Sequence, residues 1–245
     1  MEKDNWNILK NYTNARIALG RAGTSLPTTE VLQFRMAHAL AKDAISAKID
    51  VLGLNEEAEK IGMNTISIKS NNLNRIEYLQ NPNNGRLLDE ESKIKLQNLA
   101  DKKGDLCIII ADGLSADAVN FHALNLINAL IPKLKIQIIN PLIIVKYGRV
   151  AISDVIGKML NASIAIILIG ERPGLSSPNS MGAYVTYNPK PGNTDEKRNC
   201  VSNIQFQGLN YEFAAMKLAY LVDQMVTKKI SGVQIKDNFS DYYLP

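Results

Sequence analysis

The chain has 245 residues, of which 46% are hydrophobic and 21% are charged, so its length and composition are those of a globular protein with a sizeable core. Its 28 Lys and Arg residues are interleaved with 24 Asp and Glu residues, which leaves a net charge of +4. Because the positive charges form no basic stripe, binding to nucleic acid or to an anionic membrane is disfavoured.

The apolar runs of the chain are far shorter than the roughly 20 residues that a membrane helix needs. The first residues, MEKDNWNILKNYTNAR, contain acids and amides where a signal peptide has a basic start and an apolar core. Only two cysteines are present, Cys107 and Cys200, which suits a reducing compartment. We therefore expect a cytoplasmic protein without a membrane span or a disulfide framework.

The N-terminal part of the chain predicts helices. A short helix is expected over residues 6–12, and apolar residues that recur every four positions predict a longer helix over residues 29–45. Thr28 or Thr29 is expected to cap the start of that longer helix.

A strand and two further helices are expected before residue 104. Ile66 and Ile68 alternate with polar neighbours, which predicts a short edge strand. Helices are predicted near residues 73–79 and 89–102, with a turn between them. Residues 1–104 are therefore predicted to form a mainly helical N-terminal region.

From residue 105 onward, strands and helices alternate. The runs around residues 106–111, 141–145 and 163–169 are continuously apolar, which is typical of parallel strands buried on both faces. The predicted fold class is α/β, with a Rossmann-like, mostly parallel, doubly wound sheet and an N-terminal helical region. Residues 105–245 are predicted to form the Rossmann-like domain.

Two helix boundaries are expected in this second part. Ser115 is positioned to cap the helix that follows the first apolar run. A long amphipathic helix is predicted over residues 211–229, with Gly232 ending it.

Ligands of doubly wound sheets bind beyond the carboxyl ends of the strands. This rule predicts one rim that contains Asp112, Gly113, the corner at residues 147–150 and the turn at residues 170–174. The polar segments that follow, up to residue 203, are rich in Gly, Pro, Asn and Ser and much longer than most connections in compact domains. They predict a binding surface for a large polar ligand or a partner protein.

The usual phosphate-binding and catalytic motifs do not occur. No G-x-G-x-x-G follows a predicted strand, and no G-x-x-x-x-G-K-[ST] is present. The two histidines, His38 and His122, fall inside predicted helices, and neither they nor the cysteines have zinc-ligand spacing. We therefore expect both histidines to be structural and no zinc site to be formed.

Two polar positions near the rim are candidates for ligand binding. Glu171 follows a buried strand directly and either pairs with a neighbouring arginine or accepts hydrogen bonds from ligand amides or amines. Cys200 lies among Asn199, Ser202 and Asn203, whose amide and hydroxyl groups suit a neutral, amide-decorated ligand better than a polyphosphate. These groups otherwise only satisfy the loop backbone.

Seven motifs occur in order between residues 15 and 237: RIALGRAGTSLPT, YLQNPNNGRLL, ADGLSADAV, KYGRVAISDVIG, IGERPGLSSPNSMGAYVTY, KRNCVSNI and KLAYLVDQMVTKKISGVQIKD. Together they resemble the small-subunit family of ethanolamine ammonia-lyase. The resemblance implies an adenosylcobalamin-dependent lyase that converts ethanolamine to acetaldehyde and ammonia. In this family the large subunit, a TIM barrel, performs the radical chemistry, and the small subunit is inactive without it.

The resemblance also assigns roles to three residues. It implies that Val150, Glu171 and Cys200 contact the cobalamin, which lies between the two subunits, and that none of the three is catalytic or a metal ligand. Some family members have a longer N-terminal extension associated with a bacterial microcompartment, whereas about fourteen residues precede the first motif here. Encapsulation is therefore left open.

Two other functions remain as alternatives. One is a non-catalytic Rossmann-like module that binds a nucleotide, which the missing glycine motifs disfavour. The other is an assembly subunit whose polar loops only contact a partner protein.

Overall fold

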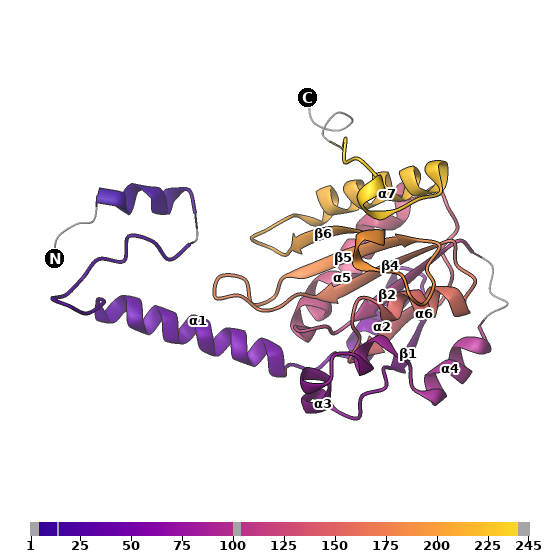
Figure 1. Ribbon diagram of the computed structural model, residues 1–245, viewed down its shortest axis with the longest axis horizontal. Helices are drawn as coiled ribbons and strands as arrows, with labels where there is room; N and C mark the ends of the chain where they lie inside the picture. Colours follow the sequence, from indigo (N-terminus) through magenta and orange to yellow (C-terminus); the bar gives the residue numbers. More distant parts are fainter. Residues whose placement is uncertain (1–4, 14, 100–103, 240–245) are drawn as a thin grey trace.

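A six-stranded sheet forms the centre of the computed structural model, which describes residues 5–13, 15–99 and 104–239 (Figure 1). The strand order is β1-β3-β2-β4-β5-β6. The strands are β1 (Thr65–Lys69), β2 (Leu106–Ala111), β3 (Leu142–Lys146), β4 (Ile164–Gly170), β5 (Met181–Tyr187) and β6 (Arg198–Ile204).

The sheet is mixed, which confirms the α/β class and agrees with a mostly parallel sheet in four of its six strands, although the sequence did not predict the antiparallel direction of β5 and β6. The pairings among β1, β3, β2 and β4 are parallel, whereas β4 with β5 and β5 with β6 are antiparallel. The reason is the connection: parallel neighbours need a crossover, usually through a helix, and the described chain enters β5 and β6 through loops that carry at most a single 3-10 turn.

The central strands are buried on both faces, as their continuous apolar runs predict. Along β2, Ile108 and Ile110 face one core cluster, whereas Cys107 and Ile109 face the other. Every residue of β2 and β4 is buried. Cys107 is a core residue, which confirms its predicted position within a strand.

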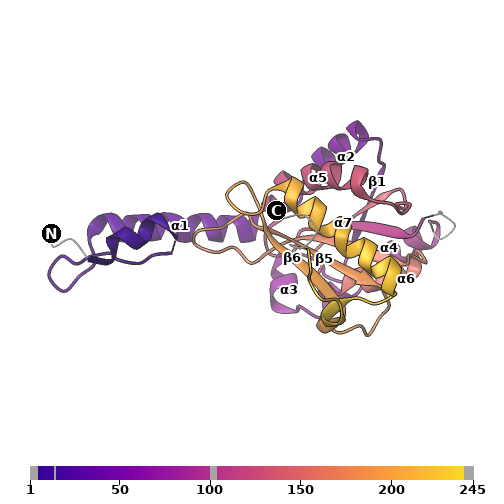
Figure 2. The ribbon, with the colours of Figure 1, turned by 90° about the horizontal axis from the view of Figure 1, so that it is seen from above.

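Helices pack against both faces of the sheet (Figures 1 and 2). Helices α2, α5 and α7 cover one face, and α4 and α6 cover the other. The α-helices are α1 (Thr28–Ser46), α2 (Val51–Lys60), α3 (Arg75–Gln80), α4 (Glu90–Gln97), α5 (Ala116–Leu130), α6 (Ile152–Met159) and α7 (Tyr211–Lys228). None of the described helices is both long enough and apolar enough to cross a bilayer.

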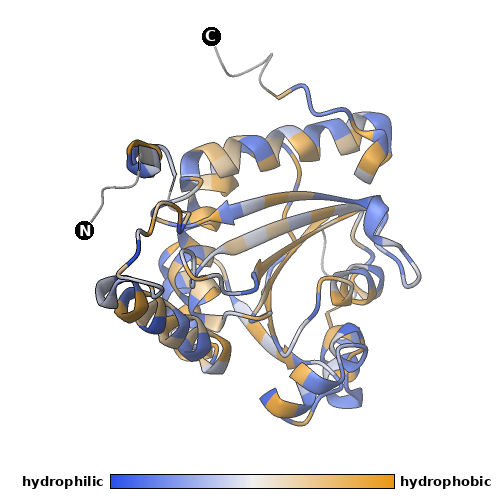
Figure 3. Ribbon diagram, turned by 60° about the vertical axis from the view of Figure 1, so that its left-hand side comes forward, coloured by the Kyte–Doolittle hydropathy of each residue, from blue (hydrophilic) through white to orange (hydrophobic). Residues whose placement is uncertain are grey.

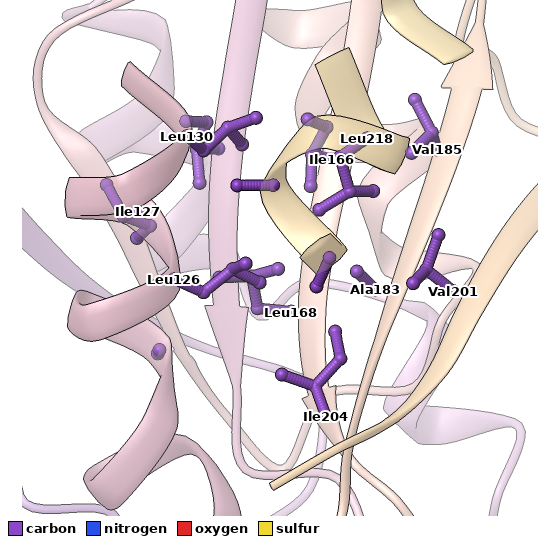
Figure 4. Close-up of a cluster of buried hydrophobic side chains, with 14 of the residues drawn as sticks. Leu126, Ile127, Leu130, Ile166, Leu168, Ala183, Val185, Val201, Ile204 and Leu218 are labelled. Carbon is purple, nitrogen blue, oxygen red and sulfur yellow. The ribbon is translucent and has the colours of Figure 1, made fainter. Parts of the chain in front are cut away.

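The larger core cluster lies between α5, α7 and the sheet. Leu126, Ile127 and Leu130 of α5 belong to the same cluster as Ile166 and Leu168 of β4, and all five are labelled in Figure 4. Each such side chain contributes about 1.5–3 kcal/mol when it is fully buried. The cluster also holds β5 and β6 on the sheet through Ala183, Val185, Val201 and Ile204.

Helix α1 extends away from the sheet instead of packing on it (Figures 1 and 2). The expected apolar stripe is present, but Leu32, Met36 and Leu40 are exposed, and apolar and polar residues alternate along α1 in Figure 3. Apolar periodicity predicts a helix but not which element packs against its apolar face, because that depends on tertiary contacts. The expected caps are also wrong, since Pro27 is the N-cap residue and no side chain caps the helix.

Several other predicted elements match the structure closely. The segment expected as a short helix is a 3-10 helix (Asn5–Asn11), and Ile66 and Ile68 lie in the edge strand β1. Because β1 pairs with β3, the sheet contains strands from both sides of residue 104. The division of the chain into two regions there stays a prediction.

The structure corrects several helix boundaries. Ser115 is the N-cap residue of α5, but its hydroxyl donates to the carbonyl of Pro178 instead of capping the helix. Helix α7 ends at Lys228, and its C-cap residue is Lys229, in the left-handed conformation, instead of Gly232. Helix α4 ends at Gln97, and the rest of the helix expected there lies partly outside the described residues. Helix α2 was not predicted, although Asp50 caps it.

Candidate functional site

The carboxyl ends of β2, β3 and β4 meet on one rim, as the sequence predicts. In the sheet, β2 lies between β3 and β4, and the three strands run parallel, so their carboxyl ends share one edge. Leu114 donates its N–H to the carbonyl of Gly170 over 3.0 Å. Gly113 has a φ of 53°, and a Cβ there would overlap that same carbonyl oxygen, so the close approach requires glycine.

Asp112 fixes the neighbouring corner of the chain to the end of β2. Its Oδ1 accepts the N–H of Gly148 over 3.1 Å, and its Oδ2 lies 3.6 Å from Nη1 of Arg75. The side chain is almost fully buried. Burial raises the pKa of Asp112 to about 6, although backbone N–H groups and the charge of Arg75 oppose this.

This shift predicts a pH-dependent stability. Below about pH 3.8 the carboxyl is protonated in both states, whereas above about pH 6 the folded protein must bury its charge, so the stabilisation present at low pH is lost as pH rises. The difference in unfolding free energy between the wild type and Asp112→Asn should therefore fall between pH 4 and pH 7, by roughly 1.4 kcal/mol per pKa unit. Urea denaturation at each pH measures it, with exposed Asp105→Asn as control. A difference that is constant or rises with pH would contradict the shift.

Val150 and Cys200 line the same open hollow, of about 340 Å³, although they are fifty residues apart in the chain. Val150 lies in the corner before α6, and Cys200 lies on β6. The other residues that line the hollow are Pro82, Arg86, Arg149, Ala151, Tyr184, Asp195 and Arg198.

Cys200 lies farther from the rim than expected. It is opposite Tyr184 of β5, in the middle of the antiparallel pair, because β6 begins at Arg198 and reaches the rim only at Ile204. Burial raises the pKa of the Cys200 thiol, and the charge of Glu171 adds to this, while a hydrogen bond with Tyr184 opposes it. The thiol therefore stays protonated near neutral pH and is a poor nucleophile.

Glu171 lies beside this hollow but does not line it. Its Oε2 accepts the hydroxyl of Ser180 and the N–H of Asn203. Its Oε1 lies over Gly182, where a Cβ would be only 2.9 Å away. Within the described part of the chain, no hydrogen bond uses Oε1 and no arginine pairs with Glu171, so the structural ion pair considered above is not formed.

Residues 3–236 match the family model described as ethanolamine ammonia-lyase light chain (EutC). The chain belongs to this family. It is 44% identical over 237 residues to the ethanolamine ammonia-lyase small subunit of Pseudomonas fluorescens (strain SBW25), covering 95% of this chain and 86% of the relative.

Other members of the light-chain family are similar to the same extent. The small subunit of Azotobacter vinelandii is 44% identical over 237 residues, covering 95% of this chain and 88% of the relative. The small subunit of Xanthomonas campestris pv. campestris (strain B100) is 45% identical over 241 residues, covering 96% and 88%. The resemblance drawn from the seven motifs is thus confirmed at the level of the family.

The histidines of this light-chain family member lie in helices, as expected. His122 of α5 is buried, with Nδ1 2.8 Å from the hydroxyl of Tyr211, and burial lowers its pKa. His38 lies on exposed α1. In the part of the light chain that the structure describes, no group of three or more His, Cys, Asp and Glu residues is arranged to hold a metal.

Apart from the corner at residues 147–150, which contains Arg149, the sequence did not single out the polar residues that surround Val150 and Cys200. Tyr184 is paired with Cys200 and points to the same side of the sheet. The alternation of side chains along β5 predicts this only when the register between β5 and β6 is known. Arg149 follows a glycine at the end of β3, and Arg86 belongs to a 3-10 helix (Asn84–Arg86) far away in the light-chain sequence. No local pattern connects these segments.

Proposed function

We propose that this chain acts as the small subunit of an adenosylcobalamin-dependent ethanolamine ammonia-lyase, which converts ethanolamine to acetaldehyde and ammonia. The observation that carries the proposal is the match to the light-chain family over nearly the whole chain. The large subunit is expected to be a TIM barrel with the substrate site. This chain contributes a Rossmann-like wall of the cofactor site and is inactive alone.

The residues of the site fit an amide-decorated cofactor. A corrinoid carries acetamide and propionamide arms at its edge, and Oε1 of Glu171 is available to accept from an amide nitrogen. The Tyr184 hydroxyl and the Cys200 thiol are neutral polar groups, and Val150 offers an apolar contact. We therefore propose that Val150, Glu171 and Cys200 contact the cobalamin.

The size of the hollow supports a shared site. Small-molecule pockets that enclose a drug-sized ligand measure about 300–1,000 Å³, and a corrinoid is larger than such a ligand. An open hollow of about 340 Å³ can form one wall but cannot enclose a corrinoid. A second chain must supply the rest, which supports a hetero-oligomer with the large subunit.

The role of this chain is to hold and orient the cofactor. When bound, adenosylcobalamin supplies radical chemistry through homolysis of its cobalt–carbon bond. Glu171, Tyr184 and Cys200 supply hydrogen-bonding groups, and the raised pKa of the Cys200 thiol keeps it neutral. We assign no acid, base or nucleophile of the reaction to this chain. A cytoplasmic location, with or without enclosure in a bacterial microcompartment, is part of the same proposal.

Reconstitution tests the proposal. The chain, its cognate large subunit and adenosylcobalamin are mixed, and acetaldehyde release and corrinoid retained after gel filtration are measured for the mixture and for each chain alone. Only the mixture should release acetaldehyde and retain the corrinoid. Full activity and retention by the large subunit alone would favour the assembly-subunit alternative.

Glu171→Gln should weaken corrinoid retention in this mixture. The amide keeps the shape of the side chain but removes its charge, so the dissociation constant should rise about 10- to 100-fold, equivalent to about 1–3 kcal/mol. Titration followed by the visible absorption of the corrinoid measures the change, with exposed Glu57→Gln as control. An unchanged constant would show that Glu171 only orders the loop through Ser180 and Asn203.

A further inference from the structure

The hollow beside Cys200 is lined by three arginines, Arg86, Arg149 and Arg198, and by one carboxylate, Asp195. The three arginines come from separate segments of the chain, namely the 3-10 helix before β2, the corner after β3 and the start of β6, and Asp195 lies in the 3-10 turn just before β6. A guanidinium group is costly to bury unless carboxylates or a ligand compensate its charge, and among the three Arg198 is buried, Arg149 is half-buried and Arg86 is exposed.

Only part of this positive charge is compensated within the described chain. Arg198 donates from Nη2 to Asp154, and both side chains are 2% exposed. The more distant Arg75 faces Asp112. Among the described residues, neither Arg86 nor Arg149 has a carboxylate within ion-pair distance, and Asp195 lies only near Nε of Arg198, at 3.9 Å.

Arg149 is held rigidly without a hydrogen-bond acceptor for its Nε. Its guanidinium lies over the ring of Tyr78, 4.4 Å from the centroid, and the Tyr78 hydroxyl donates to the carbonyl of Gly148. Its backbone N–H donates to the carbonyl of Gly85, where a Cβ would be only 2.7 Å from Cγ of Arg149. In the described chain, Nε of Arg149 and Nε of Arg198 are both buried without a hydrogen-bond partner.

A helix also begins at this hollow. Val150 and Ala151, which line it, directly precede α6, and Ala151 is an N-cap residue whose side chain provides no cap. The positive end of a helix dipole favours an anion nearby. Besides the helix start, the hollow is lined by Arg86 and Arg149, neither of which has a carboxylate partner among the described residues.

We propose that this hollow is an anion subsite for a single phosphate group, held by Arg149 and Arg86. The inference rests on the proposed function: cobalamin carries one phosphodiester in its nucleotide loop, which is the anionic group that the corrinoid would bring to this wall. Two uncompensated arginines suit one phosphate, and Asp195 at the same hollow would repel a polyphosphate.

The experiment compares two corrinoids that differ only by a phosphate. Adenosylcobinamide and adenosylcobinamide phosphate are titrated into the complex of this chain with the large subunit, and binding is followed by visible absorption. The wild type should bind the phosphate form at least 10-fold more tightly. Arg86→Gln and Arg149→Gln should each reduce that ratio several-fold and leave the affinity for adenosylcobinamide unchanged, whereas Arg149→Lys should restore part of it.

Controls separate the anion subsite from folding and from net charge. Lys158→Gln, at the other end of α6, removes one positive charge away from the hollow and should not change the ratio. Because Arg149 packs on Tyr78, the result for Arg149→Gln is used only if that variant still binds adenosylcobinamide. If it does not, Arg86→Gln tests the subsite, because Arg86 is exposed and its replacement should not disturb the fold. Added inorganic phosphate should compete only with the phosphate form.

The outcomes distinguish this inference from the proposed function. A phosphate preference that is absent, or that survives in both arginine variants, overturns the anion subsite while corrinoid binding itself stands. If inorganic phosphate binds at the arginines but the corrinoid phosphate gives no preference, the site serves free phosphate and the inference is overturned. Failure of the wild-type complex to bind adenosylcobalamin at all overturns the proposed function and the subsite with it.

Discussion

Replacing Gly170 by alanine is expected to destabilise the protein by about 3 kcal/mol or more. A Cβ at Gly170 would overlap the carbonyl oxygen of Ser115 and lie 2.6 Å from the carbonyl oxygen of Asp112. Both are backbone atoms at the ends of buried elements, so they cannot move aside as a flexible side chain can. The midpoint of urea denaturation, monitored by circular dichroism, measures the loss.

Gly174→Ala is the matched control for Gly170→Ala. Gly174 lies four residues later in the chain, and the nearest atom to a Cβ there is 4.0 Å away, so the added methyl group makes only an ordinary van der Waals contact. Its effect should stay within about 0.5 kcal/mol. Equal effects of the two substitutions would contradict the close approach of β2, β4 and the start of α5 at the rim.

Removing the charge of Asp154 is expected to cost about 3–5 kcal/mol of unfolding free energy. Asp154 accepts Nη2 of Arg198 and the side-chain amide of Asn193, and the two charged side chains are each only 2% exposed. Asp154→Asn keeps the shape but leaves the charge of Arg198 buried and unpaired. Urea denaturation measures the loss, and Glu91→Gln, in an exposed pair with Lys95, should cost no more than about 0.5 kcal/mol.

A double substitution separates the pair from the rest of the fold. If the penalty comes from an unpaired buried charge, Asp154→Asn combined with Arg198→Met should be more stable than Asp154→Asn alone. Additive losses would show instead that Arg198 stabilises the fold through its contacts with the carbonyls of Asn193 and Thr194.

The sequence predicted the elements whose signals are local. The continuous apolar runs of β2 and β4 indicated buried parallel strands because both faces are covered by helices. The rim residues Asp112 and Gly113 followed from the same rule. The direction of β5 and β6 was not accessible in this way, because alternating apolar residues predict a strand but not the direction in which it pairs.

The candidate site was predicted in part for the same reason. Val150 and Glu171 each follow a recognisable strand, so their neighbourhood at its carboxyl end was expected. The distance of Cys200 from the rim depends on the register between β5 and β6, which includes an irregularity next to Met181. Arg149 is held beside the segment of Arg86 by its contacts with the ring of Tyr78 and with Gly85, which are tertiary contacts without a sequence period.

The hollow beside Cys200 is built from segments more than one hundred residues apart, from Pro82 to Cys200. The hollow forms only when the 3-10 helix before β2, the corner after β3 and the last strand are all in place, because each supplies part of its wall. A ligand that binds there needs all three segments in place, so it stabilises the folded chain by an amount that grows with the ratio of ligand concentration to Kd. Occupancy of the hollow and global folding are thus one coupled equilibrium.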